Sequence, residues 1–148
     1  MDEWYTPKYI IESLGDFDLD PCAPENPLFQ TATTMYNKED DGLSKEWFGR
    51  VWLNPPYSRP LIEMFMNKLA EHNNGTALLF NRCDNKMFHD VIFKRAVAIK
   101  FLRKRIRFLK PDGTQAGSPN CGSVLIAFGK NNAEILQKNS LEGKFIRL

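Results

Sequence analysis

Three short apolar segments of this sequence each end in polar side chains. They are residues 17–19, 51–53 and 76–80, and they are followed by Asp20, Asn54 and Asn81. Short runs of β-branched, aromatic and aliphatic residues predict buried strands. In an open α/β sheet, ligands bind outside the carboxyl ends of the strands. The repeated pattern therefore predicts an α/β fold in which the three polar clusters line one cleft.

The second segment runs into the tetrad Asn54-Pro55-Pro56-Tyr57. A strand must end here, because Pro55 has no N–H for a partner strand and Pro56 restricts the conformation of Pro55. The stiff loop holds two acceptors together, the side-chain carbonyl of Asn54 and the backbone carbonyl of Pro55. A planar group with an exocyclic NH2, such as adenine, can donate both hydrogens to them, which frees the nitrogen lone pair to attack an electrophile. Tyr57 adds a face on which the base can stack.

The four residues alone also fit a simple turn, with Asn54 bonded to nearby backbone and Tyr57 packed on the core. After an apolar strand, however, they resemble the catalytic motif of amino methyltransferases that use S-adenosylmethionine. From about Trp4 to Gly129, the chain resembles the small phage and prophage DNA N6-adenine methyltransferases of the Dam type.

This resemblance implies a reduced Rossmann-like sheet of the class I methyltransferase kind, with helices on both faces. It implies methyl transfer from S-adenosylmethionine to N6 of an adenine flipped out of double-stranded DNA. Asn54 and Pro55 would hold the amine, Pro56 would stiffen the loop and Tyr57 would stack on the base.

The amino-terminal segment predicts a helix. Thr6 can cap it, Pro7 suits its first position, and apolar residues recur at helical spacing up to Leu14. An aromatic-Thr-Pro start also resembles the amino-terminal cofactor motif of adenine methyltransferases. The resemblance implies that Tyr5, Thr6 and Pro7 contact the methionine end of the cofactor, whereas the residues themselves require only a capped amphipathic helix.

The end of the first predicted strand offers a second cofactor segment. Asp20 and Pro21 end the strand, and the small residues Cys22 and Ala23 leave room for a ligand near the backbone. These four residues resemble the first cofactor motif of the family. A proline-rich stretch, residues 24–27, replaces the usual G-x-G loop, and a turn capped by Asp20 is the alternative.

Residues 28–50 are too few for a complete second βαβ unit, since a crossover takes at least about 10–12 residues besides its strands. Within them, Asp41 belongs to an Asp-Asp-Gly-Leu segment that resembles the acidic segment of the phage family. The resemblance implies hydrogen bonds from Asp41 to cofactor hydroxyls or to the adenosyl amine. A solvated Asp-Gly turn is the alternative.

Two groups of residues are expected to contact DNA. Ser58 and Arg59 follow the tetrad and can reach the base or a phosphate. The second group lies within residues 100–110, of which six in eleven are basic, and consists of Arg103, Lys104, Arg105 and Arg107. Alternation with Ile106 and Phe108 predicts a strand with one basic face that tracks phosphates. A charged, solvated sheet edge is the alternative.

The rest of the chain follows the same pattern of helices and strands. Helical spacing covers residues 58–71 and 87–92, strands are predicted at 96–101 and 123–128, and a polar loop spans 111–122. After residue 131 the apolar signal weakens, which predicts a short helix and a tail.

Length and composition limit the remaining possibilities. The 148 residues predict one domain, 1–148, without a separate recognition module, and a net charge of +2 neither demands nor excludes nucleic acid. Three widely spaced cysteines and two histidines indicate neither a disulfide framework nor a metal site, and the cysteines favour a reducing cytoplasm. The resemblance to phage and prophage enzymes implies that this is the cytoplasm of a bacterial host. Asp2 and Glu3 are unlike a signal peptide, and no run approaches the ~18 apolar residues of a membrane span. The sequence does not indicate an oligomeric state.

Other functions share these features. The same tetrad serves methylation of cytosine N4, of RNA adenine or of a protein amide. A catalytically silent DNA-binding protein that kept the fold and the basic segment belongs to a different class. Cofactor binding separates the classes, because an intact tetrad predicts it and a silent binder does not require it.

Overall fold

The computed structural model describes residues 5–148, so the predicted features at Asp2, Glu3 and Trp4 lie outside the described residues. Seven strands in this part of the chain form one sheet in the order β2-β1-β3-β4-β6-β5-β7. The strands are β1 (Leu19–Asp20), β2 (Thr34–Met35), β3 (Val51–Leu53), β4 (Gly75–Phe80), β5 (Ala98–Leu102), β6 (Ser123–Phe128) and β7 (Gly143–Arg147). Strands β1 to β4 are parallel, whereas β6 is antiparallel to β4 and β5, and β7 is antiparallel to β5. This mixed sheet is compatible with a Rossmann-like fold.

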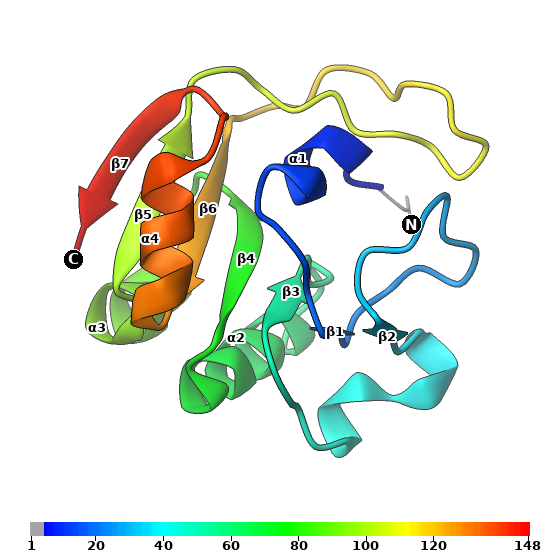
Figure 1. Ribbon diagram of the computed structural model, residues 1–148, viewed down its shortest axis with the longest axis horizontal. Coiled ribbons are helices and arrows are strands. Elements are labelled where there is room, and N and C mark those ends of the chain that lie inside the picture. The colour runs from blue at the N-terminus through cyan, green and yellow to red at the C-terminus, as the bar shows by residue number, and fades with distance from the viewer. Residues whose placement is uncertain (1–4) are drawn as a thin grey trace.

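Helices cover both faces of the sheet (Figure 1). They are α1 (Lys8–Glu12), α2 (Leu61–His72), α3 (Phe93–Arg95) and α4 (Lys130–Lys138), with the 3-10 turns η1 (Lys38–Asp40) and η2 (Gly42–Ser44) and the π-helical segment η3 (Phe88–Ile92). One apolar cluster joins α2 and η3 to Leu53 and Leu79, and the other joins α1 and α4 to Trp52 and Leu78. Successive strand residues point to opposite faces, so β3 and β4 contribute to both clusters. The predicted α/β class with helices on both faces is confirmed.

The strand order places a switch point at β1. From β1 the chain moves outward to β2, and after η1 and η2 it returns to β3 on the other side of β1. Residues 28–50 contain no α-helix, which confirms the predicted shortening of this region. A crevice opens at such a point outside the carboxyl ends of the neighbouring strands. Asp20 at the end of β1 and Asn54 after β3 are therefore placed beside one another.

Arg50, directly before β3, connects this strand to the loop after α1 and to helix α4. Its buried guanidinium donates hydrogen bonds to the Leu14 carbonyl at 2.6 Å and to Asn132 Oδ1 at 2.7 Å, and it lies 4.1 Å from the centre of the Phe17 ring. The backbone N–H of Arg50 also donates to the Asp18 carboxylate at 2.7 Å. Burial lowers the pKa of Arg50 to about 10, so the side chain is charged at neutral pH. One cation thus connects the loop after α1, the start of β3 and helix α4.

The prediction of a basic strand after residue 102 is wrong. The β5 strand ends at Leu102, the chain bends at residues 103–104, and residues 105–108 belong to no strand. Their alternation is nevertheless seen, because Ile106 and Phe108 are buried and the four basic side chains are exposed. The backbone instead pairs at Leu109 with Tyr5 and at Phe108 with the loop residue Ala116. A pattern of side-chain burial predicts an extended chain but does not supply the neighbour that makes it a strand.

Two further predictions need correction. The segment predicted as a tail contains β7, which adds to the sheet edge beside β5. Most side chains of β7 are exposed, so the apolar signal that would have predicted this strand is absent. The first strand is β1, Leu19–Asp20, instead of residues 17–19, and Asp20 itself pairs with Met35.

Candidate active site

The tetrad lies where the sequence predicts, directly after β3, and lines a cavity of about 990 Å³. The cavity brings together most of the predicted catalytic and cofactor residues. They are Tyr5, Thr6, Asp20, Cys22, Ala23, Asn54, Pro55, Pro56 and Tyr57, and the adjacent Ser58 and Arg59 also line it. These side chains come from three separate parts of the sequence, which meet because β1 and β3 are neighbours in the sheet.

Asn54 is held by a residue from the amino-terminal segment. Its side-chain Nδ2 donates a hydrogen bond to Thr6 Oγ1 at 3.1 Å. The Asn54 Oδ1 atom makes no hydrogen bond with the described residues and is the acceptor left for a ligand. The prediction that Thr6 caps the first helix is wrong, because α1 begins at Lys8 with Pro7 as its N-cap and has no side-chain cap.

The Tyr57 side chain belongs to a group of aromatic residues that line the cavity. Its ring stacks on Phe80 with centroids 5.1 Å apart, and Phe108 meets Phe80 edge-on at 5.9 Å. The Tyr57 hydroxyl accepts a hydrogen bond from the Phe80 N–H at 2.6 Å. Desolvation raises the pKa of Tyr57 above its usual range, so the phenol is neutral at physiological pH. Tyr57 as a whole residue is 41% exposed, so part of it stays accessible although its ring packs on Phe80.

Sequence reasoning did not identify Phe80 and Phe108 as site residues, although both line the cavity. The place of each residue in the sequence pattern was the signal that could have identified it. Phe80 is the last residue of a buried strand that ends in a polar cluster, and Phe108 is on the apolar side of the alternating basic segment.

Asp20 is a buried carboxylic acid beside the tetrad. It is 3% exposed, and it accepts hydrogen bonds from the Cys22 N–H at 3.1 Å and from Thr31 Oγ1 at 2.5 Å. Burial raises the pKa of Asp20 to about 6, and the two hydrogen bonds oppose that increase. Burial and the neighbouring Asp20 raise the pKa of the Cys22 thiol to about 12, so Cys22 acts as a small side chain and not as a nucleophile.

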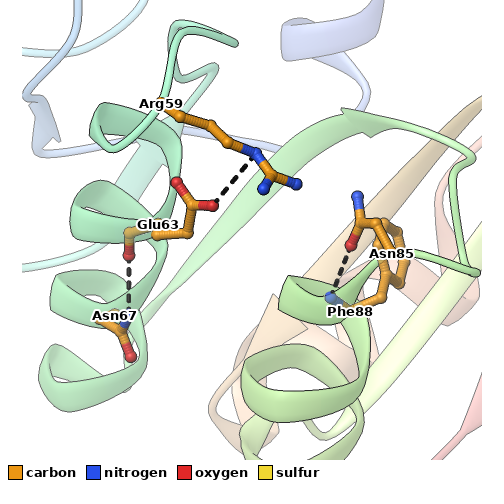
Figure 2. Close-up of polar contacts among 5 residues, drawn as sticks. All are labelled: Arg59, Glu63, Asn67, Asn85 and Phe88. Carbon is orange, nitrogen blue, oxygen red and sulfur yellow. Dashed lines mark hydrogen bonds and ion pairs between the residues drawn. The ribbon is translucent and has the colours of Figure 1, made fainter.

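A further wall of the cavity comes from α2 and from the segment after β4 (Figure 2). Arg59 and Glu63 form an ion pair at 3.5 Å across one turn of the chain. Asn85 Oδ1 accepts a hydrogen bond from the Phe88 N–H at 2.9 Å. Arg82 lies near the Phe80 ring, 5.9 Å from its centre. Apart from Arg59, these residues were not predicted as site residues, although Arg82 lies in the polar cluster that follows β4.

Several predicted residues are not brought to the cavity. Asp41 is exposed between η1 and η2 with a positive φ of 54°, and its carbonyl accepts from Ser44. Pro7 is the N-cap of α1. Pro21 packs against Gly42, where an added Cβ would lie 2.1 Å from the Pro21 oxygen. Neither proline is among the residues that line the cavity.

The basic residues Arg103, Lys104, Arg105 and Arg107 also lie outside the cavity lining. Arg105 donates to the Pro119 carbonyl at 2.9 Å, and Arg107 donates to Ser118 Oγ at 2.8 Å. Each guanidinium carries five N–H donors, so these contacts fix the direction of the side chains and leave donors for another partner. The contacts also hold the loop of residues 111–122 against the extended basic segment.

The fold and the cavity together define an α/β protein with a cavity at the carboxyl ends of its parallel strands. The chain matches the family described as DNA N-6-adenine-methyltransferase (Dam) over residues 1–143, and it belongs to that family. It is 40% identical over 88 residues to a protein of Escherichia phage T1 named DNA N-6-adenine-methyltransferase. The matched part is 53% of this chain and 35% of the phage protein, so the chain spans about a third of that curated relative. No solved structure matches the chain significantly.

Among residues 5–148, no group of three or more His, Cys, Asp or Glu side chains is placed to hold a metal ion. None of the helices within these residues combines the length and the apolar character needed to cross a membrane.

Proposed function

We propose that this protein transfers a methyl group from S-adenosylmethionine to N6 of adenine in DNA, with residues 1–148 as a class I methyltransferase domain. The observation that supports this most directly is the hydrogen bonding of the Asn54 side chain and its place at the cavity. Its Nδ2 donates to Thr6, its Oδ1 makes no hydrogen bond with the described residues, and Asn54 and Pro55 line a cavity together with Asp20, Cys22 and Ala23. Membership of the DNA N-6-adenine-methyltransferase family supports the same reaction.

The cavity suits S-adenosylmethionine. Its volume of about 990 Å³ lies at the upper end of the ~300–1,000 Å³ range of small-molecule sites, which leaves room for a cofactor and a base together. Its lining combines apolar side chains such as Phe29 and Phe88 with polar groups such as Asp20 and Thr31. Of the predicted cofactor residues, we assign Tyr5, Asp20, Cys22 and Ala23 to the cofactor, whereas Thr6 lines the same cavity and holds Asn54. Pro7, Pro21 and Asp41 lie outside the lining and have the least structural support of the predicted set.

Bound in this cavity, S-adenosylmethionine supplies a methyl group on a sulfonium, and the electrons of the broken S–C bond stay on sulfur. Asn54 Oδ1 and the Pro55 carbonyl accept the two hydrogens of the adenine amine, which turns its lone pair toward the methyl group. Pro56 limits the movement of the loop, and Tyr57 stacks on the base. The new N–C bond forms as the amine loses one proton to water. Positioning of the two reactants accounts for much of the rate.

The adenine must leave the DNA stack to reach this cavity, at a cost of a few kcal/mol. Ser58 and Arg59 line the cavity beside the tetrad, where we place the target nucleotide. Arg103, Lys104, Arg105 and Arg107 are exposed and supply charge for phosphates further along the duplex. Such contacts give affinity that falls with salt and carries no sequence information by itself.

The test is transfer of labelled methyl from S-adenosylmethionine to unmethylated DNA, followed by digestion to identify the labelled nucleoside. Asn54→Ala should lower the rate by about 100-fold or more, as loss of an activating polar contact does in other enzymes. Asn67→Ala is the matched control, since Asn67 lies on the exposed side of α2 and donates only to the Glu63 carbonyl.

Label in N6-methyladenine that depends on Asn54 and not on Asn67 would support the proposal. Label in N4-methylcytosine, or label in RNA alone, would move the substrate within the same chemistry. A folded protein that binds DNA but neither binds S-adenosylmethionine nor transfers label would refute the enzymatic proposal and favour a silent DNA-binding protein.

A further inference from the structure

Thr6 makes a contact that its place in the sequence does not predict. Its side chain is buried, with 6% exposure, and its hydroxyl accepts the hydrogen bond from Asn54 Nδ2. The two residues are 48 positions apart, and both line the cavity. The hydroxyl does not cap α1, so the usual structural reason for a threonine before a helix does not apply.

A hydrogen bond to a fixed neighbour holds the plane of an asparagine amide, and a hydroxyl can bond to either end of that amide because it both donates and accepts. One side of the group is an acceptor and the other carries two donors, and they exchange places when the side-chain torsion turns by about 180°. In the observed orientation Nδ2 meets Thr6, and Oδ1 is the atom without a protein partner among the described residues. In the opposite orientation, Nδ2 would face the incoming amine and two donors would oppose each other, so the amine selects the observed orientation of an amide that Thr6 holds in place.

We propose that Thr6 is a positioning residue that holds the Asn54 side chain in place at the cavity, so that its Oδ1 is available to the substrate amine. This inference rests on the proposed function, because the role of the orientation is to accept hydrogens from that amine. Thr6 acts through Asn54 and need not touch the base. Loss of the hydroxyl leaves the Asn54 amide free to turn, so fewer molecules present the acceptor at any time.

Thr6→Val tests this inference because it replaces the hydroxyl with a methyl group of similar size. We expect kcat to fall by about fivefold, the effect of one neutral hydrogen bond, while the Kd for S-adenosylmethionine and the KM for DNA stay within about twofold. Thr6→Ser keeps the hydroxyl and should restore kcat to within about twofold of the original protein. Thr76→Val is the matched control, because Thr76 is fully buried, its Oγ1 makes no hydrogen bond, and it lies outside the cavity lining.

A second measurement does not depend on activity. The side-chain amide signal of Asn54, identified by its absence in Asn54→Ala, can be followed by ¹⁵N–¹H NMR. Thr6→Val should shift this signal and speed exchange of its hydrogens with water, and Thr6→Ser and Thr76→Val should leave it in place.

The outcomes separate this inference from the proposed function. If the original protein transfers no methyl group, the proposed function fails. If it is active and Thr6→Val leaves both kcat and the Asn54 signal unchanged, the positioning role fails alone. Equal losses in Thr6→Val and Thr6→Ser would also overturn it, since the hydroxyl would then not be the cause. A weaker Kd for S-adenosylmethionine with unchanged kcat would make Thr6 a cofactor ligand instead.

Discussion

Asp20→Asn should stabilise this protein at neutral pH, because the carboxylate it replaces is buried at a cost. Asp20 is 3% exposed, and its pKa is raised from 3.8 to about 6. The folded protein therefore holds this proton more tightly than the unfolded chain does. The carboxyl group imposes no penalty well below pH 4, and the penalty grows as the pH rises from about 4 to about 6 and is complete above that range.

The size of the penalty follows from the two pKa values. A difference between 3.8 and about 6 corresponds to about 3 kcal/mol of unfolding free energy above pH 7 and to about half of that at pH 5. An asparagine keeps the existing contacts, because its oxygen can accept from the Cys22 N–H and its amide can donate to the Thr31 hydroxyl. We therefore expect Asp20→Asn to gain up to about 3 kcal/mol at pH 7.5 and less at pH 5.

Urea unfolding of both proteins at pH 5 and pH 7.5 measures this difference. Asp90→Asn, at an exposed position outside the cavity, controls for the loss of one negative charge. A loss of stability in Asp20→Asn that is equal at the two pH values would refute the reasoning, since the carboxylate would then contribute through contacts and not carry a burial penalty. We also expect Asp20→Asn to weaken binding of S-adenosylmethionine, so the gain in stability would be accompanied by a loss of function.

Two further predictions concern the cations. Arg50→Met should lower the free energy of unfolding, measured in urea, by about 3–5 kcal/mol, because Asn132 Oδ1 and the Leu14 carbonyl lose their charged donor. A change below about 1 kcal/mol would contradict the view that Arg50 holds the loop after α1, the start of β3 and α4 together. Arg107→Gln should weaken DNA binding to a similar degree for all sequences and reduce the slope of log K against log salt by about one. Arg147→Gln, on the edge strand β7, is the control and should leave this slope unchanged. Equal effects of the two substitutions would contradict a phosphate role for the basic segment.

The core of the site was predictable from local chemistry. Two prolines after three buried residues allow only a strand that ends in a stiff loop, and the structure has β3 and its tetrad there. The rule that ligands bind at the carboxyl ends of strands then placed Asp20, Cys22 and Ala23 beside Asn54, and they line one cavity. Predictions of this kind need only short segments and a general property of parallel sheets.

Other predictions failed where a residue's role depends on a distant neighbour. Residues 103–108 alternate as a strand does, but the chain beside them offers no ladder of partners. Strand β7 was missed because an edge strand with exposed side chains carries no burial pattern. Asp41 was selected by resemblance, and the turn between η1 and η2 places it at the surface.

By itself the sequence determined the α/β class, the tetrad at the end of a buried strand and the family to which the chain belongs. Only the tertiary structure decided that Thr6 meets Asn54, that Phe80 stacks on Tyr57 and that Arg50 joins three elements. The physical reason is the distance along the chain over which each effect acts. Backbone propensity and side-chain periodicity act over a few residues, whereas contacts between residues tens of positions apart are fixed by the order and register in which the strands pair.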